Sequence, residues 1–110
     1  MSTLSTHVLD TMHGTPAAGM AVVLLGPDGE IARSRTNGDG RCPDLAPAPL
    51  RAGAYRLQFA VAAYFRERKI KLPDPPFLDV VSIDFGMSGE GHYHVPLLVS
   101  PFSYSTYRGS

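Results

Sequence analysis

The sequence predicts an all-β fold, a two-sheet antiparallel sandwich of about eight short strands with one short helix. Apolar and polar residues alternate with a period of two in several segments, as they do in half-buried strands. Turn residues separate these segments at the short spacing that is typical of β-sandwiches. The 11 glycines and 10 prolines form about a fifth of the 110 residues, and both residue types disfavour long helices.

Three of the predicted strands, at 54–59, 79–85 and 93–99, carry an apolar row on one face. In residues 54–59, Tyr55, Leu57 and Phe59 share a face, while Arg56 and Gln58 point to the other,. The other strand candidates are residues 4–9, 20–25, 31–35, 79–85, 93–99 and 102–110. The last of these segments reaches the final residue. It predicts a terminal strand that is held in place, because chain ends otherwise fray.

Turn and helix signals complete the predicted order of elements. The sequence Gly-Pro-Asp-Gly at 26–29 predicts a hairpin between two strands,. A second loop follows at 37–40, where two glycines permit a positive φ. Only residues 61–71 combine good helix formers, and Pro73 stops this segment,. The sequence therefore predicts one helix of two or three turns at most.

Composition excludes several classes of protein. The 10 Lys and Arg residues balance the 10 Asp and Glu residues, which argues against a nucleic-acid or anionic-membrane surface. The single Cys42 excludes an intrachain disulfide and a zinc site of four cysteines. The longest apolar run, 20–25, is too short to span a membrane, and the first residues lack a signal-peptide pattern. We expect one domain over residues 1–110, located in the cytoplasm.

His92 and His94 point to the same face of the strand at 93–99, opposite its apolar row. Two interpretations are open: solvated surface histidines or part of a site. A His-x-His pair can bind zinc or copper, but no neighbouring carboxylate is spaced to supply a third ligand. Pro96 cannot donate to a sheet, so it predicts an edge strand or a bulge. Such a position either adjoins a ligand or protects an edge from aggregation.

His7 and Arg41 are the other candidates for chemistry. His7 shares a strand face with Ser5 and Leu9, a pattern that also suits a surface or interface residue. Arg41 follows the glycine-rich turn, which could present its guanidinium to a planar polar substrate. A solvated loop arginine is the alternative.

Three segments together resemble a known family. They are residues 4–10 with 14–17, residues 36–41, and residues 92–101 with the terminal Tyr-Arg-Gly-Ser at 107–110. This combination resembles the 5-hydroxyisourate hydrolases of the transthyretin-related family, from residue 4 to the last. The hormone carriers of that family lack the terminal tetrapeptide. Their residues at the positions of His7, Arg41 and His94 look like lysine, glutamate and threonine. Residues 43–53 and 73–76 depart from the family pattern.

The resemblance implies a transthyretin-like sandwich that assembles as a homotetramer, with sites between its dimers. It also implies hydrolytic opening of the ring amide of 5-hydroxyisourate in urate degradation. The expected product is 2-oxo-4-hydroxy-4-carboxy-5-ureidoimidazoline. No metal or organic cofactor is expected. The alternative is a non-catalytic transthyretin-like protein that binds a small ligand.

The resemblance also assigns the site residues. His7 and His94 would form the acid/base pair, since imidazoles titrate near neutral pH, and the order of their roles is open. Arg41 keeps its proton and would stabilise negative charge. Tyr107, Arg108 and Ser110 would bind the substrate. His92 would support the site or lie on the surface.

Overall fold

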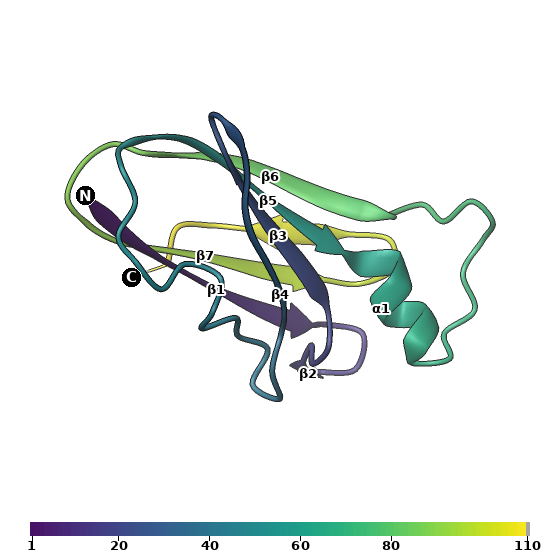
Figure 1. Cartoon of the computed structure of the whole chain (residues 1–110). Coiled ribbons are helices and arrows are strands. Elements are labelled where there is room, and N and C mark those ends of the chain that lie inside the picture. The colour runs from purple at the N-terminus through teal and green to yellow at the C-terminus, as the bar shows by residue number, and fades with distance from the viewer. Residues whose placement is uncertain (110) are drawn as a thin grey trace.

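The computed structural model describes residues 1–109 and contains two four-stranded sheets (Figure 1). Sheet A has the strand order β2-β1-β7-β8, and sheet B has the order β4-β3-β5-β6. One helix, α1, follows β5. The elements are β1 (Ser2–Asp10), β2 (Thr15–Pro16), β3 (Ala21–Gly26), β4 (Gly29–Arg35), β5 (Gly53–Ala60), α1 (Val61–Glu67), β6 (Val80–Met87), β7 (Gly91–Val99) and β8 (Tyr104–Thr106). The predicted sandwich with one short helix is therefore confirmed.

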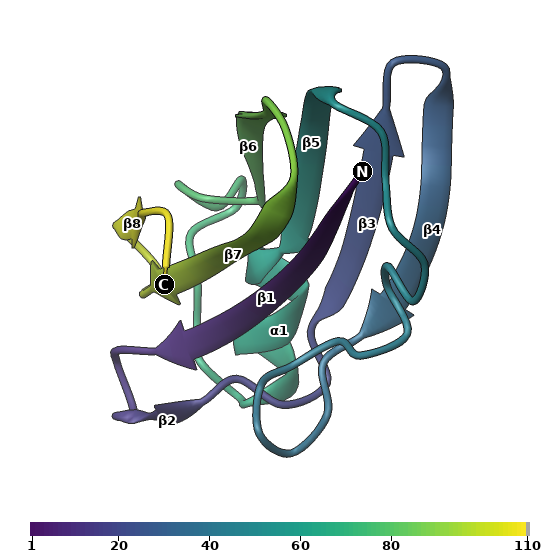
Figure 2. The same ribbon diagram turned by 90° about the vertical axis from the view of Figure 1, so that its left-hand side faces the viewer.

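The apolar rows of the two sheets form the core. Figure 2 shows the sheets lying face to face, with α1 beyond one end of β5. Fully buried side chains come from both sheets, and they include Val8, Val22, Leu24, Leu57, Phe59, Leu97 and Val99. The helix adds Val61, Tyr64 and Phe65 to this core. Each such side chain contributes about 1.5–3 kcal/mol on burial. With seven residues, α1 is too short to cross a membrane, and no other helix lies within residues 1–109.

The pairing of β1 with β7 is parallel, which corrects the prediction of a purely antiparallel sandwich. Their register runs from Ser2 opposite Gly91 to Asp10 opposite Val99, and both arrows point the same way in Figure 2. A tight turn forces antiparallel pairing, as it does between β3 and β4,. Most of the chain separates β1 from β7, so no hairpin sets their relative direction.

Pro96 lies inside a central strand, so the prediction of an edge strand was wrong. The carbonyls of His94 and Pro96 both face β8, where they accept hydrogen bonds from Gly109 N and Thr106 Oγ1 at 2.7 Å each. The N–H that proline lacks is therefore missing on the β8 side. Here the β7–β8 ladder stops at Thr106 and resumes as a single bridge between His94 and Gly109.

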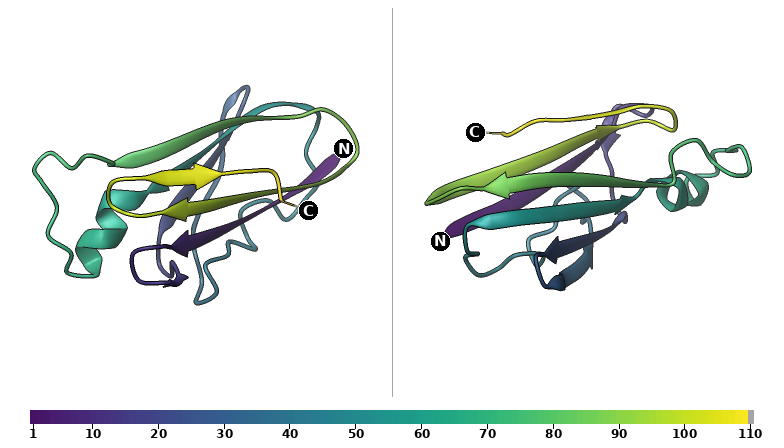
Figure 3. Two further views of the ribbon diagram at one scale, coloured as in Figure 1. Left: turned by 180° about the vertical axis from the view of Figure 1, so that it is seen from behind. Right: turned by 90° about the horizontal axis from the view of Figure 1, so that it is seen from above.

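The predicted terminal strand is shorter than expected. The ladder of β8 holds only Tyr104–Thr106, and residues 107 and 108 lie outside it before Gly109 rejoins β7. Figure 3 shows this segment in yellow beside β7. Ser110 lies outside the described residues.

A buried carboxylate ties the end of β1 to α1. The side chain of Asp10 is fully buried and accepts hydrogen bonds from His13 N at 3.0 Å and Tyr64 Oη at 2.7 Å. Its Oδ2 also lies 2.6 Å from Nδ1 of His13. Burial alone raises the pKa of Asp10, but the hydrogen bonds from His13 and Tyr64 outweigh it and hold that pKa below its usual value,.

We predict that Asp10→Asn lowers the free energy of unfolding by about 2–3 kcal/mol at pH 7, because it removes the charge from three hydrogen bonds. Folded Asp10 binds its proton more weakly than unfolded Asp10. Its contribution is therefore complete above about pH 4 and is lost as the pH falls through the lower folded pKa. The free energies of unfolding of the two proteins should therefore converge at low pH. Urea unfolding of both proteins from pH 7 to pH 2 measures this difference. The exposed Asp28→Asn is the control, and a constant difference at all pH values would contradict the assignment.

Candidate active site

The register between β1 and β7 brings the candidate histidines onto the outward face of sheet A. Ser5 lies opposite His94, and His7 lies opposite Pro96. Alternation places all four on the face turned away from the core. His7 and His94 are thus diagonal neighbours, with Cα atoms roughly 8 Å apart from the spacing of strands and residues in a sheet. Both side chains are half-buried.

Arg41 reaches the same region because its turn docks on β1. Val8 N donates to Gly40 O at 2.8 Å, and His7 forms a bridge with Arg41. Inside the turn, the Asn37 side chain accepts hydrogen bonds from the backbone N–H groups of Asp39 and Arg41. Gly40 has a φ of +76°, and a Cβ there would lie 2.4 Å from Val8 O. Only glycine fits this position, so the turn and the strand together place Arg41 beside His7.

Two hydroxyl groups and two imidazoles form a chain across the outward face. Oγ1 of Thr3 lies 2.7 Å from Nδ1 of His92, and Nε2 of His92 lies 2.8 Å from Oγ of Ser5. The same Ser5 Oγ lies 2.7 Å from Nδ1 of His94. The chain begins at exposed residues, Thr3 and His92, and ends at the half-buried His94. These hydrogen bonds fix the orientation of both rings. They do not involve Nε2 of His94.

The surroundings of His94 favour its neutral form. Burial lowers the pKa of His94, and the charges of Arg41, His7 and His92 lower it further,. A histidine with a pKa below its usual 6.5 is an uncharged base at neutral pH,. The cation Arg41 therefore keeps a proton acceptor available beside it.

The end of the chain packs directly on His94. Gly109 N donates to His94 O at 2.7 Å, and a Cβ on Gly109 would lie 2.5 Å from Cδ2 of the imidazole. Arg108 turns away instead, with its guanidinium 4.0 Å from the ring centre of Tyr93. Tyr107 and Arg108 both line a hollow of about 350 Å³ between β6 and β8. Within one chain, the structure does not bring these two side chains to His94.

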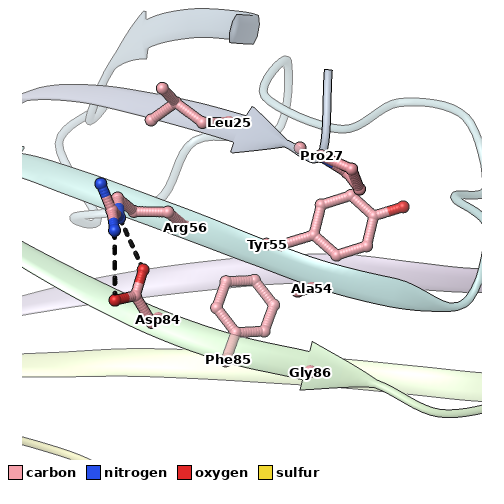
Figure 4. Close-up of a pocket in the computed structure, with 9 residues that line it drawn as sticks. Leu25, Pro27, Ala54, Tyr55, Arg56, Asp84, Phe85 and Gly86 are labelled. Carbon is pink, nitrogen blue, oxygen red and sulfur yellow. Dashed lines mark hydrogen bonds and ion pairs between the residues drawn. The ribbon is translucent and has the colours of Figure 1, made fainter. Parts of the chain in front are cut away.

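Two other hollows bear on where a substrate could bind. One of about 320 Å³ lies beside Arg41 and is lined by Leu4, Ser5, Thr6, Asn37, Arg41, Cys42 and Pro43. Another of about 610 Å³ lies on sheet B (Figure 4), where Arg56 and Asp84 form an ion pair between neighbouring strands. The residues lining this second hollow include no histidine among those described. We therefore place the candidate site on sheet A.

Cys42 lies next to Arg41 but faces the core. The side chain is buried, with an exposed fraction of 6%. Burial raises the pKa of its thiol to about 11, and the charge of Asp44 adds to the effect,. The thiol is therefore protonated at neutral pH and unsuited to nucleophilic attack.

The His92 and His94 pair gains no third metal ligand from residues 1–109, where no group of three His, Cys, Asp or Glu side chains lies close enough to hold an ion. Ser5 and Thr3 contact these rings instead.

Sequence reasoning did not identify the hydroxyls of Thr3 and Ser5 as site residues. The alternation of β1 was the available signal, since it places Thr3 and Ser5 on the face of His7.

The fold and the site together define a class of protein. It is a transthyretin-like sandwich that carries two histidines and an arginine on its outward face. The profile of the HIUase/transthyretin family matches residues 4–109. The chain belongs to this family. It is 55% identical to the 5-hydroxyisourate hydrolase of Mesorhizobium japonicum, over 97% of this chain and 91% of that protein.

Solved structures agree with this membership. The structure of Klebsiella pneumoniae 5-hydroxyisourate hydrolase matches with a TM-score of 0.89 and 42% identity, over the full length of both chains. Sea bream transthyretin in complex with thyroxine matches with a TM-score of 0.83 and 33% identity, over 96% of this chain and 93% of that one. The fold is thus similar both to a 5-hydroxyisourate hydrolase and to a transthyretin that was solved with thyroxine.

We predict that Arg41→Gln raises the pKa of His94, because it removes one of the positive charges that disfavour the imidazolium,. The measurement is an NMR titration of the His94 ring in both proteins. Arg66→Gln is the matched control, since Arg66 is an exposed arginine on α1. An unchanged His94 titration in Arg41→Gln would show that Arg41 does not act on the ring.

Proposed function

We propose that this protein hydrolyses 5-hydroxyisourate in urate degradation, opening the ring amide to give 2-oxo-4-hydroxy-4-carboxy-5-ureidoimidazoline. The observation that carries the proposal is the meeting of His7, Arg41 and His94 on one face of sheet A. Two relatives that carry the name 5-hydroxyisourate hydrolase support it, at 55% and 53% identity over nearly the whole chain. We treat residues 1–110 as one transthyretin-like domain, and a cytoplasmic location remains a prediction.

Ring opening needs an activated water, a stabilised oxyanion and a protonated leaving nitrogen. His7 and His94 supply the proton transfers, each worth about 10²–10⁴-fold in rate. The lowered pKa of His94 supports this role, because a neutral imidazole accepts a proton from water at pH 7. Arg41 stabilises the oxyanion and orients the substrate oxygens, since its guanidinium stays charged and carries several donors.

The substrate-binding role of Tyr107, Arg108 and Ser110 belongs to the assembled protein in this proposal. Arg108 and Tyr107 line the hollow between β6 and β8 in the single chain, while Gly109 already contacts His94. A homotetramer with sites between dimers would let a neighbouring copy cover the outward face of sheet A. Water would then be excluded from His7 and His94, which strengthens electrostatic effects at the site.

We predict that the wild-type protein accelerates the decay of freshly prepared 5-hydroxyisourate, followed by ultraviolet absorbance. His94→Asn should lower kcat by about 10²–10⁴-fold, because it removes a proton-transfer group. Arg66→Gln is the control at an exposed residue outside the site, and EDTA should leave the rate unchanged. Wild-type turnover in His94→Asn would refute the acid/base role. Binding without faster decay would favour the non-catalytic ligand carrier, which the thyroxine-bound sea bream relative makes the second candidate.

We also predict a tetramer in sedimentation at micromolar concentration. The expected reason is that the face carrying His7 and Arg41 is completed by a second copy. Activity should fall on dilution in parallel with dissociation of the tetramer. A monomer with full activity at these concentrations would exclude a site between dimers.

A further inference from the structure

Thr3, His92, Ser5 and His94 form a continuous series of hydrogen bonds that ends at the candidate base. Its three contacts measure 2.7, 2.8 and 2.7 Å between donor and acceptor atoms, all within the normal range of hydrogen bonds. Every link joins a hydroxyl to a ring nitrogen. Both types of group can donate a proton on one side and accept one on the other.

The chain can be ordered in two directions. In the first, Nδ1–H of His94 donates to Ser5, the Ser5 hydroxyl donates to Nε2 of His92, and Nδ1–H of His92 donates to Thr3. Nε2 of His94 is then an unprotonated base. In the second direction every donor becomes an acceptor, and Nε2 of His94 carries the proton. Ser5 is the pivot, because its single hydroxyl serves both rings.

We propose that Ser5 is a positioning and proton-relay residue, which couples Nδ1 of His94 to His92 so that His94 acts as the base without becoming an imidazolium. This inference rests on the proposed function. It also assigns to His94 the proton of the attacking water. His92 becomes the holder of the positive charge, at the exposed end of the path.

The proton transfers balance. As the water oxygen bonds to the amide carbon, its O–H bond breaks and the proton moves to Nε2 of His94. The Nδ1 proton of His94 moves to Ser5 Oγ, and the former Ser5 proton moves to Nε2 of His92. One negative charge then lies on the substrate oxyanion and one positive charge on His92. When the C–N bond breaks, the Nε2 proton of His94 moves by way of the His7 and His94 pair to the leaving nitrogen. The Nε2 proton of His92 returns to Ser5 Oγ, and the Ser5 proton returns to Nδ1 of His94, so that both rings end neutral, as they began.

The charges around His94 explain why such a path is useful. Burial disfavours the cation of His94, and the positive charges of Arg41 and of a protonated His7 or His92 disfavour it further,. An imidazolium at His94 would lie next to the permanent charge of Arg41. Moving the charge to His92 places it two residues away along the same strand, on a side chain that is exposed in the single chain.

The test compares Ser5→Ala with Ser5→Thr, which restores the hydroxyl. Ser5→Ala should lower kcat by about 10–100-fold with little change in KM, by analogy with the loss of the hydrogen-bond partners of metal-binding histidines. Ser5→Thr should recover most of this loss. Ser82→Ala removes a hydroxyl from the outward face of sheet B and should match the wild type.

Two further measurements separate a relay from a structural role. The dependence of kcat on the D₂O fraction should be curved in the wild type, since several protons move together, and linear in Ser5→Ala. Long-range ¹H–¹⁵N NMR should show His94 Nδ1 in a hydrogen bond that Ser5→Ala abolishes. Unchanged kcat and curvature in Ser5→Ala, or an unchanged Nδ1 signal, would overturn the relay while wild-type turnover still supports the proposed function. If the wild type shows no turnover, the proposed function fails, and the NMR comparison alone decides whether Ser5 holds His94.

Discussion

The parallel register of β1 against β7 is the constraint on which the candidate site depends. It sets Ser5 against His94 and leaves His7 one diagonal step away. A slip of one residue would turn every side chain of β1 to the opposite face, carrying His7 into the core and exposing Val8. Burying an imidazole without a partner and exposing an apolar side chain are both unfavourable. The hydrophobic effect that closes the sandwich therefore also aligns the polar groups on its outer surface.

Local pattern was enough to predict the strands other than the two-residue β2, the single helix and the faces on which the histidines lie, since a period of two is a property of neighbouring residues. Pairing was not predictable in this way. Ser5 and His94 are 89 positions apart in the sequence, and nothing in either strand states which other strand it joins or in which direction. Pro96 shows the same limit. Its missing N–H suggested an edge, whereas Thr106 offers a side-chain hydroxyl to the Pro96 carbonyl where the ladder stops. The resemblance supplied the trio of His7, Arg41 and His94, but not the hydroxyls that hold the rings.

Two glycines permit close packing at the site because they have no side chain. Gly40 lets the Arg41 turn lie on the backbone of β1, and Gly109 lets the chain end lie on the ring of His94. A side chain at either position would meet backbone or imidazole atoms closer than normal contact distances. The cation and the base are thus held by backbone fit from two sides. Such fixed placement lets Arg41 bias the protonation of His94 without any reorganisation during a reaction.

Because Cys42 is buried, the rate at which its thiol is labelled would report local opening of the structure around it. A thiol with a pKa of about 11 and almost no exposed surface is inert in the closed state,. Its reaction with an alkylating reagent therefore requires the segment that carries Arg41 to detach from β1. The labelling rate under native conditions would give the free energy of that detachment, in the manner of hydrogen exchange. One native side chain, with no added probe, thereby measures how often the guanidinium leaves its place.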